Sequence, residues 1–123
     1  MTPHGANVYL SANFERNLSA IEQFFLDAEA PQVFDTLLAG LLNDVIPNLE
    51  HFPELGLPFL DRADRSAEVS RELAVLQAKL PHNTELRELL WDAYLILYSS
   101  DGAIVHLLSI KHHRQLSFDV EPP

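Results

Sequence analysis

A short cationic run near the C-terminal end of the chain contains the residues best suited to chemistry. Lys111, His112, His113 and Arg114 are consecutive, and no acidic residue occurs between positions 101 and 119. Histidine transfers protons near neutral pH because its ordinary pKa is about 6.5, and arginine binds phosphate through its planar guanidinium group. With Arg87 added, these side chains could cleave RNA through its own 2′-hydroxyl without a metal, because one group removes a proton, another protonates the leaving oxygen and a cation stabilises the phosphorane. The same residues also fit a solvated strand end, so both interpretations stay open.

The histidines do not predict a metal site. His112 and His113 are adjacent, so on a regular strand their side chains point to opposite faces and cannot bind one ion. The other four are scattered singly: His4, His51, His82 and His106. The sequence has no cysteine and none of the standard motifs that bind nucleotides, phosphates or catalytic zinc. We therefore expect no metal and no cofactor.

The net charge of −10 limits the partners of this protein. Eighteen acidic residues face eight Lys and Arg residues, which disfavours non-specific binding to nucleic acid or to an anionic membrane. Residues 1–60 alone hold eight acids and one base, Arg16. No signal-peptide pattern and no run of 18 apolar residues occur. We expect a cytoplasmic protein in which 1–123 form a single domain and the tail 120–123 is frayed.

The N-terminal half must supply a strand and two helices. Residues Asn7–Leu10 are β-prone, and Ser11 or Asn13 can cap a helix that ends near Ala30. Pro31 suits the first turn of a second helix, which Pro47 should kink or end. Apolar residues recur at helical spacing in both segments: Phe14, Leu18, Ile21 and Phe25 in the first, and Phe34, Leu37, Leu38, Leu41, Leu42 and Val45 in the second. The pair predicts an antiparallel helical hairpin.

The C-terminal half is predicted to hold a third helix and the strands that carry the cationic run. An apolar but irregular loop spans 50–64, and 66–80 shows a third helical stripe. The periodicity of residues 84–91 favours a helix, whereas residues 93–98 are β-prone. Ser99–Gly102 is a hairpin turn signal, after which Ala103–Ile110 forms a second apolar strand.

This order of elements resembles the RelE/ParE superfamily of bacterial toxins. One segment that carries the resemblance is 86–98, with Leu86-Arg87 followed by an apolar strand from Asp92 to Tyr98. The other is 105–116, a last strand with a basic end. Helical matches at 17–25 and 49–56 extend the similarity over most of the chain, and 66–80 looks like an insertion relative to short members.

The resemblance implies an α+β fold. An N-terminal strand and an antiparallel helical hairpin would pack on a twisted antiparallel sheet, with an extra helix inserted before the C-terminal strands. It implies that 84–91 is a strand, against the periodicity. It also implies a type II toxin–antitoxin system, in which a cognate antitoxin protein covers the toxin and the assembly is a homo-oligomer or a toxin–antitoxin hetero-oligomer.

Two activities occur in the superfamily. ParE-like members inhibit growth by poisoning DNA gyrase, and RelE-like members cleave mRNA on the ribosome. If the chain is a nuclease, the resemblance assigns Arg87, His112, His113 and Arg114 to catalysis. If it is ParE-like, target binding falls on a set that overlaps with these: Lys111, His113, Arg114 and Gln115.

The differences from RelE-like nucleases favour the gyrase poison slightly. Their closing tyrosine is replaced around Phe118-Asp119, and their lysine-rich segment before the second strand corresponds here to 50–62, with a single base. RNA binding also gains much of its affinity from neutralised phosphates, which an acidic chain offers at one small patch only. A third interpretation is an inactive fold-mate that only binds other proteins.

Overall fold

The computed structural model describes residues 5–58, 67–81 and 83–112. Strand β1 (Asn7–Leu10) leads into helices α1 (Ala12–Asp27) and α2 (Pro31–Gly40), a π-helical turn η1 (Leu41–Val45) and helix α3 (Ile46–His51). The two-residue strand β2 (Leu57–Pro58) and helix α4 (Ala67–Lys79) precede the strands β3 (Glu85–Trp91), β4 (Tyr94–Ser100) and β5 (Ile104–His112). The predicted α+β class is confirmed, and the segment around Arg87, where helix and strand patterns competed, is a strand.

The sheet brings the first and the last strand together. Its strand order is β1-β5-β4-β3-β2. Pairing is antiparallel from β2 to β5, whereas β1 pairs in parallel with β5 from Asn7↔Ile104 to Leu10↔Leu107. The sheet is therefore mixed, and β5, which ends at the cationic run, is held between two neighbours.

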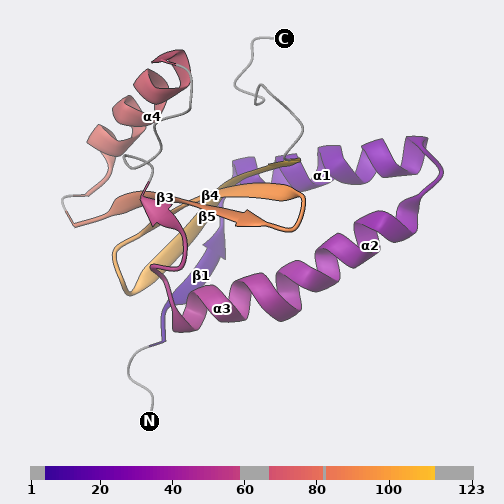
Figure 1. The fold of residues 1–123 in the computed structure, drawn as a ribbon, viewed down its shortest axis with the longest axis horizontal. Coiled ribbons are helices and arrows are strands. Elements are labelled where there is room, and N and C mark those ends of the chain that lie inside the picture. The colour runs from indigo at the N-terminus through magenta and orange to yellow at the C-terminus, as the bar shows by residue number, and fades with distance from the viewer. Residues whose placement is uncertain (1–4, 59–66, 82, 113–123) are drawn as a thin grey trace.

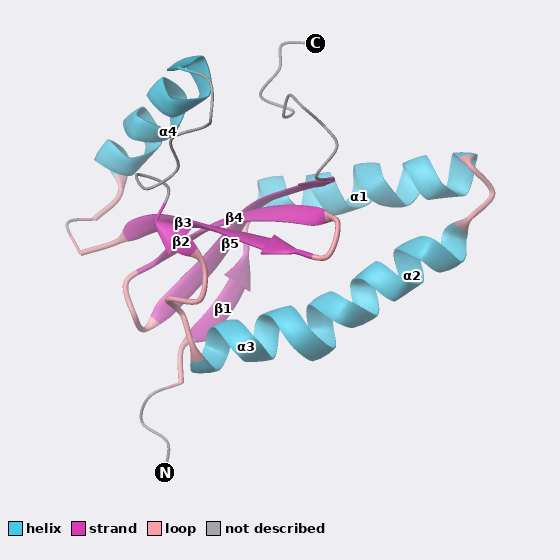
Figure 2. Cartoon of the chain, viewed as in Figure 1, coloured by secondary structure: helices cyan, strands magenta, loops and turns pink. Residues whose placement is uncertain are grey.

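The helices lie on different sides of the sheet. In Figure 1, α1 and the continuous α2–η1–α3 segment form a V-shaped hairpin to one side of the strands, as predicted. Helix α4 stands apart from them, beside β3, and Figure 2 shows the same separation of helices and strands. The side-chain amide of Gln77 fastens α4 to β3, because it donates to the Thr84 carbonyl at 2.8 Å and accepts from the Leu86 N–H at 2.9 Å.

A β-bulge at Leu108 ties the start of α1 to β5. Tyr98 pairs with Leu107 and Leu97 with Ser109, so Leu108 is an extra residue in β5. Its carbonyl accepts hydrogen bonds from the side chains of Ser11 (3.4 Å) and Asn13 (3.0 Å). Ser11 also caps α1 by accepting from the Phe14 N–H at 3.1 Å. The polar first turn of α1 thus satisfies the backbone group that the bulge leaves unpaired.

Pro47 does not end the second helix. The Ile46 N–H donates to the Leu41 carbonyl five residues back, which widens the turn just before the proline, and the helix continues to His51. A proline inside an α-helix lacks an N–H and clashes with the carbonyl four residues earlier. The wider π turn lies where that strain would fall, so the irregularity precedes Pro47 and the helix persists.

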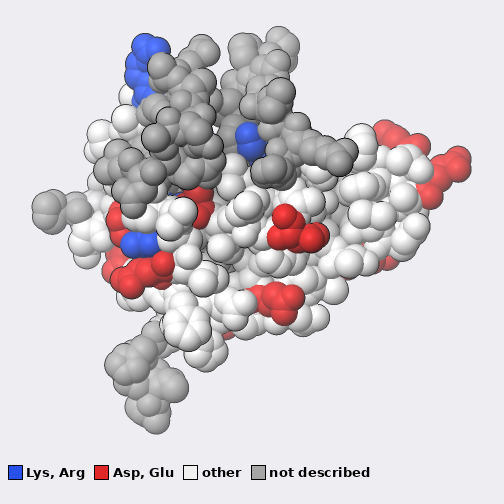
Figure 3. Space-filling model, viewed as in Figure 1, with Lys and Arg blue, Asp and Glu red and all other residues white. Residues whose placement is uncertain are grey.

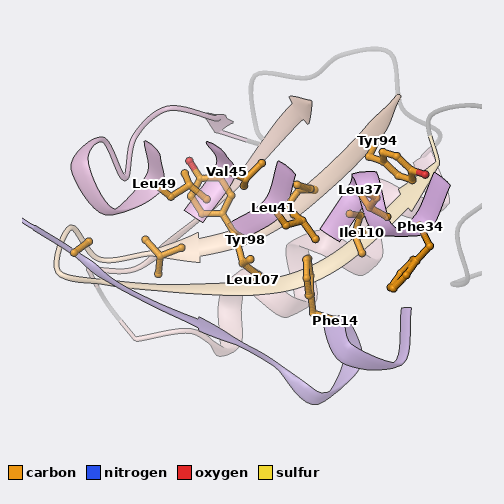
Figure 4. Packing of buried hydrophobic residues seen from close by; sticks show 13 residues of the cluster. Phe14, Phe34, Leu37, Leu41, Val45, Leu49, Tyr94, Tyr98, Leu107 and Ile110 are labelled. Atoms are coloured by element: carbon orange, nitrogen blue, oxygen red, sulfur yellow. The ribbon is translucent and has the colours of Figure 1, made fainter. Parts of the chain in front are cut away.

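The core lies between the helical hairpin and the sheet. Figure 4 shows side chains from α1, α2, η1 and α3 meeting side chains from β4 and β5. Five of the predicted stripe residues are buried there: Phe14, Phe34, Leu37, Leu41 and Val45. Leu38 and Leu42, which were predicted to belong to the stripe of the second helix, are exposed instead. The partners of the five buried residues on the strands are mainly Tyr94, Ile96, Tyr98, Val105, Leu107 and Ile110. The hairpin therefore covers one face of the sheet, which is called the hairpin face below.

Candidate functional site

Only part of the cationic run lies within the described residues. Lys111 and His112 end β5, whereas His113, Arg114 and Gln115 lie outside the described part of the chain. His112 pairs with Tyr94, a residue of the core, and Lys111 pairs with Leu95. Because neighbouring residues of a strand point to opposite faces, His112 lies on the hairpin face and Lys111 on the opposite face.

The bulge at Leu108 determines which of the two lies on the hairpin face. Val105 and Leu107 point into the core, and strict alternation from them would place Lys111 there as well. The extra residue shifts the alternation by one position, so that Ile110 and His112 follow the core side instead. A single inserted residue thus exchanges the positions of an ammonium group and an imidazole.

On the hairpin face, His112 belongs to a row of rings. The backbone register aligns Trp91, Tyr94 and His112 across β3, β4 and β5. The Tyr94 and His112 rings meet edge to face with their centroids 5.4 Å apart, and the Trp91 and Tyr94 centroids are 6.3 Å apart. Burial, and then the nearby Asp92 carboxylate, raise the pKa of Tyr94 above 10.0. This row fixes the imidazole through packing.

The opposite face of the sheet buries polar side chains. Glu88 pairs with Leu97, which pairs with Ser109, and all three therefore share the face that carries Lys111. Glu88 and Lys111 are buried, and each has an interaction partner. Charged residues are rarely buried unless they are paired, so Lys111 is held in the structure and is not a freely moving surface cation.

Arg87 lies on the hairpin face, and most of its guanidinium N–H groups donate hydrogen bonds. Its Nη1 donates to the Glu54 carbonyl at 3.1 Å and to the Gly56 carbonyl at 2.5 Å. Its Nε and Nη2 donate to one Glu85 carboxylate oxygen at 3.2 and 2.8 Å. Four of the five guanidinium N–H groups are used in this way. The arginine therefore fastens the turn after α3 to β3.

Tyr98 holds the same turn from within the core, a role that the sequence analysis missed. Its hydroxyl donates to the Pro53 carbonyl at 2.9 Å and accepts from the Gly56 N–H at 2.8 Å. Burial raises the pKa of Tyr98 above 10.0, although the Gly56 N–H and the Arg87 charge act in the opposite direction. The hydroxyl thus keeps its proton at neutral pH. We call Arg87 and Tyr98 the turn clamp.

A signal for this role is present in the sequence. Arg87 and Tyr98 lie directly opposite each other in the β3–β4 register. A tyrosine inside an apolar strand needs a hydrogen-bond partner when it is buried, and the Pro- and Gly-containing loop after α3 is one of the irregular segments that could offer backbone groups to it. Pairing the strands around a two-residue turn at 92–93 would have placed both side chains at one site.

The structure does not bring Arg87 and His112 together. Arg87 aligns with Tyr98, whereas His112 aligns with Tyr94, four positions further along the strands and one strand beyond β4. At ~3.3 Å per residue and ~4.8 Å between strands, their Cα atoms are roughly 16 Å apart. The catalytic roles of Arg87, His112, His113 and Arg114 stay predictions, and the described members of this set form no joint centre.

Comparison with known proteins adds no family to this geometry. No model of a known protein family matches the sequence, and no curated protein matches it. Within residues 5–58, 67–81 and 83–112, no three His, Asp or Glu side chains are grouped so as to hold a metal ion. No helix in this described part is long and apolar enough to cross a membrane.

Proposed function

We propose that this chain is the toxin component of a type II toxin–antitoxin system and inhibits bacterial growth by contact with DNA gyrase, in the manner of ParE-like toxins. The order of elements supports the toxin assignment. A strand, a helical hairpin on one face and a last strand that ends in a basic run are what the resemblance implies, and the chain has these elements in that order. A cognate antitoxin is the partner that this proposal requires.

The hydrogen bonds of Arg87 are the observation that favours a gyrase-binding toxin over an RNA-cleaving one. A nuclease needs this arginine to hold a phosphate, yet its guanidinium group already donates to two backbone carbonyls and a carboxylate. Releasing it would leave those acceptors without their charged donor, at a cost of about 1.5–3 kcal/mol. The cationic run beyond Lys111 then acts as a contact surface, and ribosome-dependent mRNA cleavage is the weaker alternative.

Growth arrest tests the toxin assignment. Expressed alone, the chain should arrest bacterial growth, and co-expression of its antitoxin should restore growth. Plasmid topology and mRNA integrity, scored in the same cultures, separate the two targets, because a gyrase poison relaxes or breaks plasmid DNA while a nuclease shortens mRNA. Normal growth at high soluble expression would contradict the toxin assignment and favour a fold-mate that only binds other proteins.

Two substitutions in the cationic run separate contact from proton transfer. His113→Gln keeps hydrogen bonding but cannot titrate, so a gyrase poison should retain most of its toxicity, whereas a nuclease should lose about 10²–10⁴-fold in cleavage. Arg114→Glu places repulsion in a contact surface and should abolish toxicity. Arg16→Glu, an exposed charge reversal on α1, is the matched control. Wild-type arrest by both run variants would contradict the site assignment for either target.

A further inference from the structure

The turn after α3 exposes large apolar side chains. Phe52 ends α3 with 64% of its surface exposed, and Leu55 is 46% exposed. The Leu55 N–H donates to the Phe52 carbonyl at 3.0 Å, so the two residues stand at the two ends of one tight turn. The His51 ring extends this surface, since its centroid is 6.2 Å from that of Phe52. We call His51, Phe52 and Leu55 the turn patch.

The turn clamp makes this patch rigid. Tyr98 and Arg87 together form four hydrogen bonds to the backbone of residues 53–56. Gly56 lies so close to β3 that a Cβ atom there would be 2.7 Å from the Glu88 carbonyl oxygen. The apolar side chains are therefore exposed on a fixed backbone. Preorganised apolar anchors lower the entropy that binding costs, which is the property of a docking surface and not of a floppy loop.

The charges around the patch determine what can dock on it. Glu54 lies within the turn and is exposed, and the exposed Glu85 carboxylate takes up the charge of Arg87. Figure 3 shows basic atoms bordered by acidic ones below α4, where β2 and β3 lie. An anionic membrane or a second copy of this chain, itself carrying −10, would meet like charge here. Lysine and arginine residues on a partner would meet opposite charge.

We propose that the turn patch docks a basic amphipathic segment of a partner protein. Apolar side chains of that segment cover Phe52 and Leu55, and its Lys or Arg side chains lie against Glu54. Aromatic residues are frequent anchors at such contacts, and Phe52 is the aromatic anchor here. The docking surface is separate from the cationic run and does not depend on the toxin assignment.

A display experiment tests this docking surface. The purified full-length chain is used to select from a phage library of random 16-residue peptides, and enriched peptides are synthesised and titrated by fluorescence anisotropy. The selected peptides should combine Lys or Arg with Leu or Phe. Phe52→Ser with Leu55→Ser should weaken their binding on the order of tenfold or more, and Glu54→Lys should weaken it as well. Phe24→Ser with Leu42→Ser, which changes two apolar residues of the helical hairpin that are at least as exposed as Phe52 and Leu55, is the matched control and should leave the binding unchanged.

Three outcomes would overturn the proposal. The first is enrichment without basic residues, or no enrichment at all. The second is equal loss of binding in the control variant, which would indicate general attraction to an acidic protein. The third is that Phe52→Ser abolishes either a dimer detected by light scattering or binding to phosphatidylserine vesicles. In that case a second copy of the chain or an anionic membrane, and not a basic segment, would cover the patch. Unchanged melting temperatures of all variants verify that each result concerns binding and not folding.

Discussion

The two ends of the sheet on its hairpin face are fixed by different physics. At one end the turn clamp, Arg87 and Tyr98, holds the backbone of residues 53–56 through directed hydrogen bonds. At the other end, which we call the exit end and which holds the last residue of β5, Trp91, Tyr94 and His112 pack as rings. Each end also has a glycine that lets a neighbouring group approach the backbone closely. Gly56 lies against Glu88 and Tyr98 at the clamped end, which is the end held by the turn clamp, and Gly40 lies against Trp91 at the exit end.

The contrast shows that the partners of a residue, and not its type, determine its role. Arg87 and His112 are both suited to phosphate chemistry, yet one fastens a turn and the other packs against a tyrosine. At the clamped end, the guanidinium group of Arg87 donates to the backbone of the turn after α3. The other end continues in sequence into the cationic run, to which the proposed function assigns the target contacts.

The largest expected effect comes from the core residue between the two ends. Figure 4 places Leu41 between Tyr98 and Tyr94, and its side chain is buried. Leu41→Ala should lower the free energy of unfolding by about 2–5 kcal/mol, since it leaves a cavity in the core. The neighbouring Leu42 is exposed, and Leu42→Ala should stay within ~0.5 kcal/mol. Urea unfolding checks both, and equal effects would show that the hairpin is wrongly placed.

Substituting the two glycines compares the ends directly. A Cβ at Gly56 would lie 2.7 Å from a backbone oxygen and 2.9 Å from the Tyr98 ring, so Gly56→Ala should cost about 1–3 kcal/mol through overpacking. A Cβ at Gly40 would meet only the Trp91 side chain, at 2.4 Å. That ring is half-buried and can turn to make room for the methyl group. Alanine also favours a helix by about 1 kcal/mol over glycine, which offsets part of the cost of Gly40→Ala. Thermal melts should therefore rank Gly56→Ala as the more damaging; the reverse order would contradict a rigid clamped end.

Removing the hydroxyl group from each tyrosine isolates the hydrogen bonds. Tyr98→Phe leaves the Gly56 N–H and the Pro53 carbonyl without their partner, which should cost about 1–3 kcal/mol. The Tyr94 hydroxyl makes no hydrogen bond to the described residues, so Tyr94→Phe should change the stability by less than ~0.5 kcal/mol. Urea midpoints of the two variants give the comparison. Equal losses of stability in the two variants would contradict a stabilising role for the hydrogen bonds of the Tyr98 hydroxyl.

Alkaline pH should weaken the clamped end in a gradual way. The pKa of Tyr98 is raised in the folded protein, mainly by burial, whereas an unfolded tyrosine ionises near pH ~10. The folded protein therefore favours the neutral phenol. The contribution of this group to the free energy of unfolding is complete below pH ~10, and it is lost as the pH rises through the higher pKa that Tyr98 has in the folded protein. Stability measured from pH ~8 to ~12 should fall above pH ~10, and Tyr98→Phe should flatten this fall. A pH dependence that Tyr98→Phe leaves unchanged would assign the effect to other groups.

Regular periodicity predicted most of the fold. The apolar spacing of Phe14, Leu18 and Ile21 identified α1, and Ser11 caps it as one of the two predicted candidates. The stripe from Phe34 to Val45 identified the second helix. These patterns work because burial of one helix face repeats with the helical period.

What the sequence did not reveal depends on single residues whose effects are set by tertiary contacts. The sequence left open whether Pro47 kinks or ends the helix, and the π turn before it lets the helix continue. The bulge at Leu108 becomes identifiable only when the β4–β5 register is known. The turn clamp joins Arg87 and Tyr98 to a loop more than thirty residues away. Pattern analysis within a short window does not reach such contacts.

The parallel pairing of β1 with β5 has a consequence for how the chain folds during synthesis. Asn7 pairs with Ile104, so β1 has no partner strand until almost all of the described chain has been translated. The helical hairpin, in contrast, depends on local contacts and can form early. Until β5 emerges, the growing polypeptide lacks the strand that joins β1 to β4, together with its core side chains Val105, Leu107 and Ile110. Nascent chains that end before residue 104 should therefore be protease-sensitive and prone to aggregate, and completion of β5 should convert them to the resistant, folded form in a single late step.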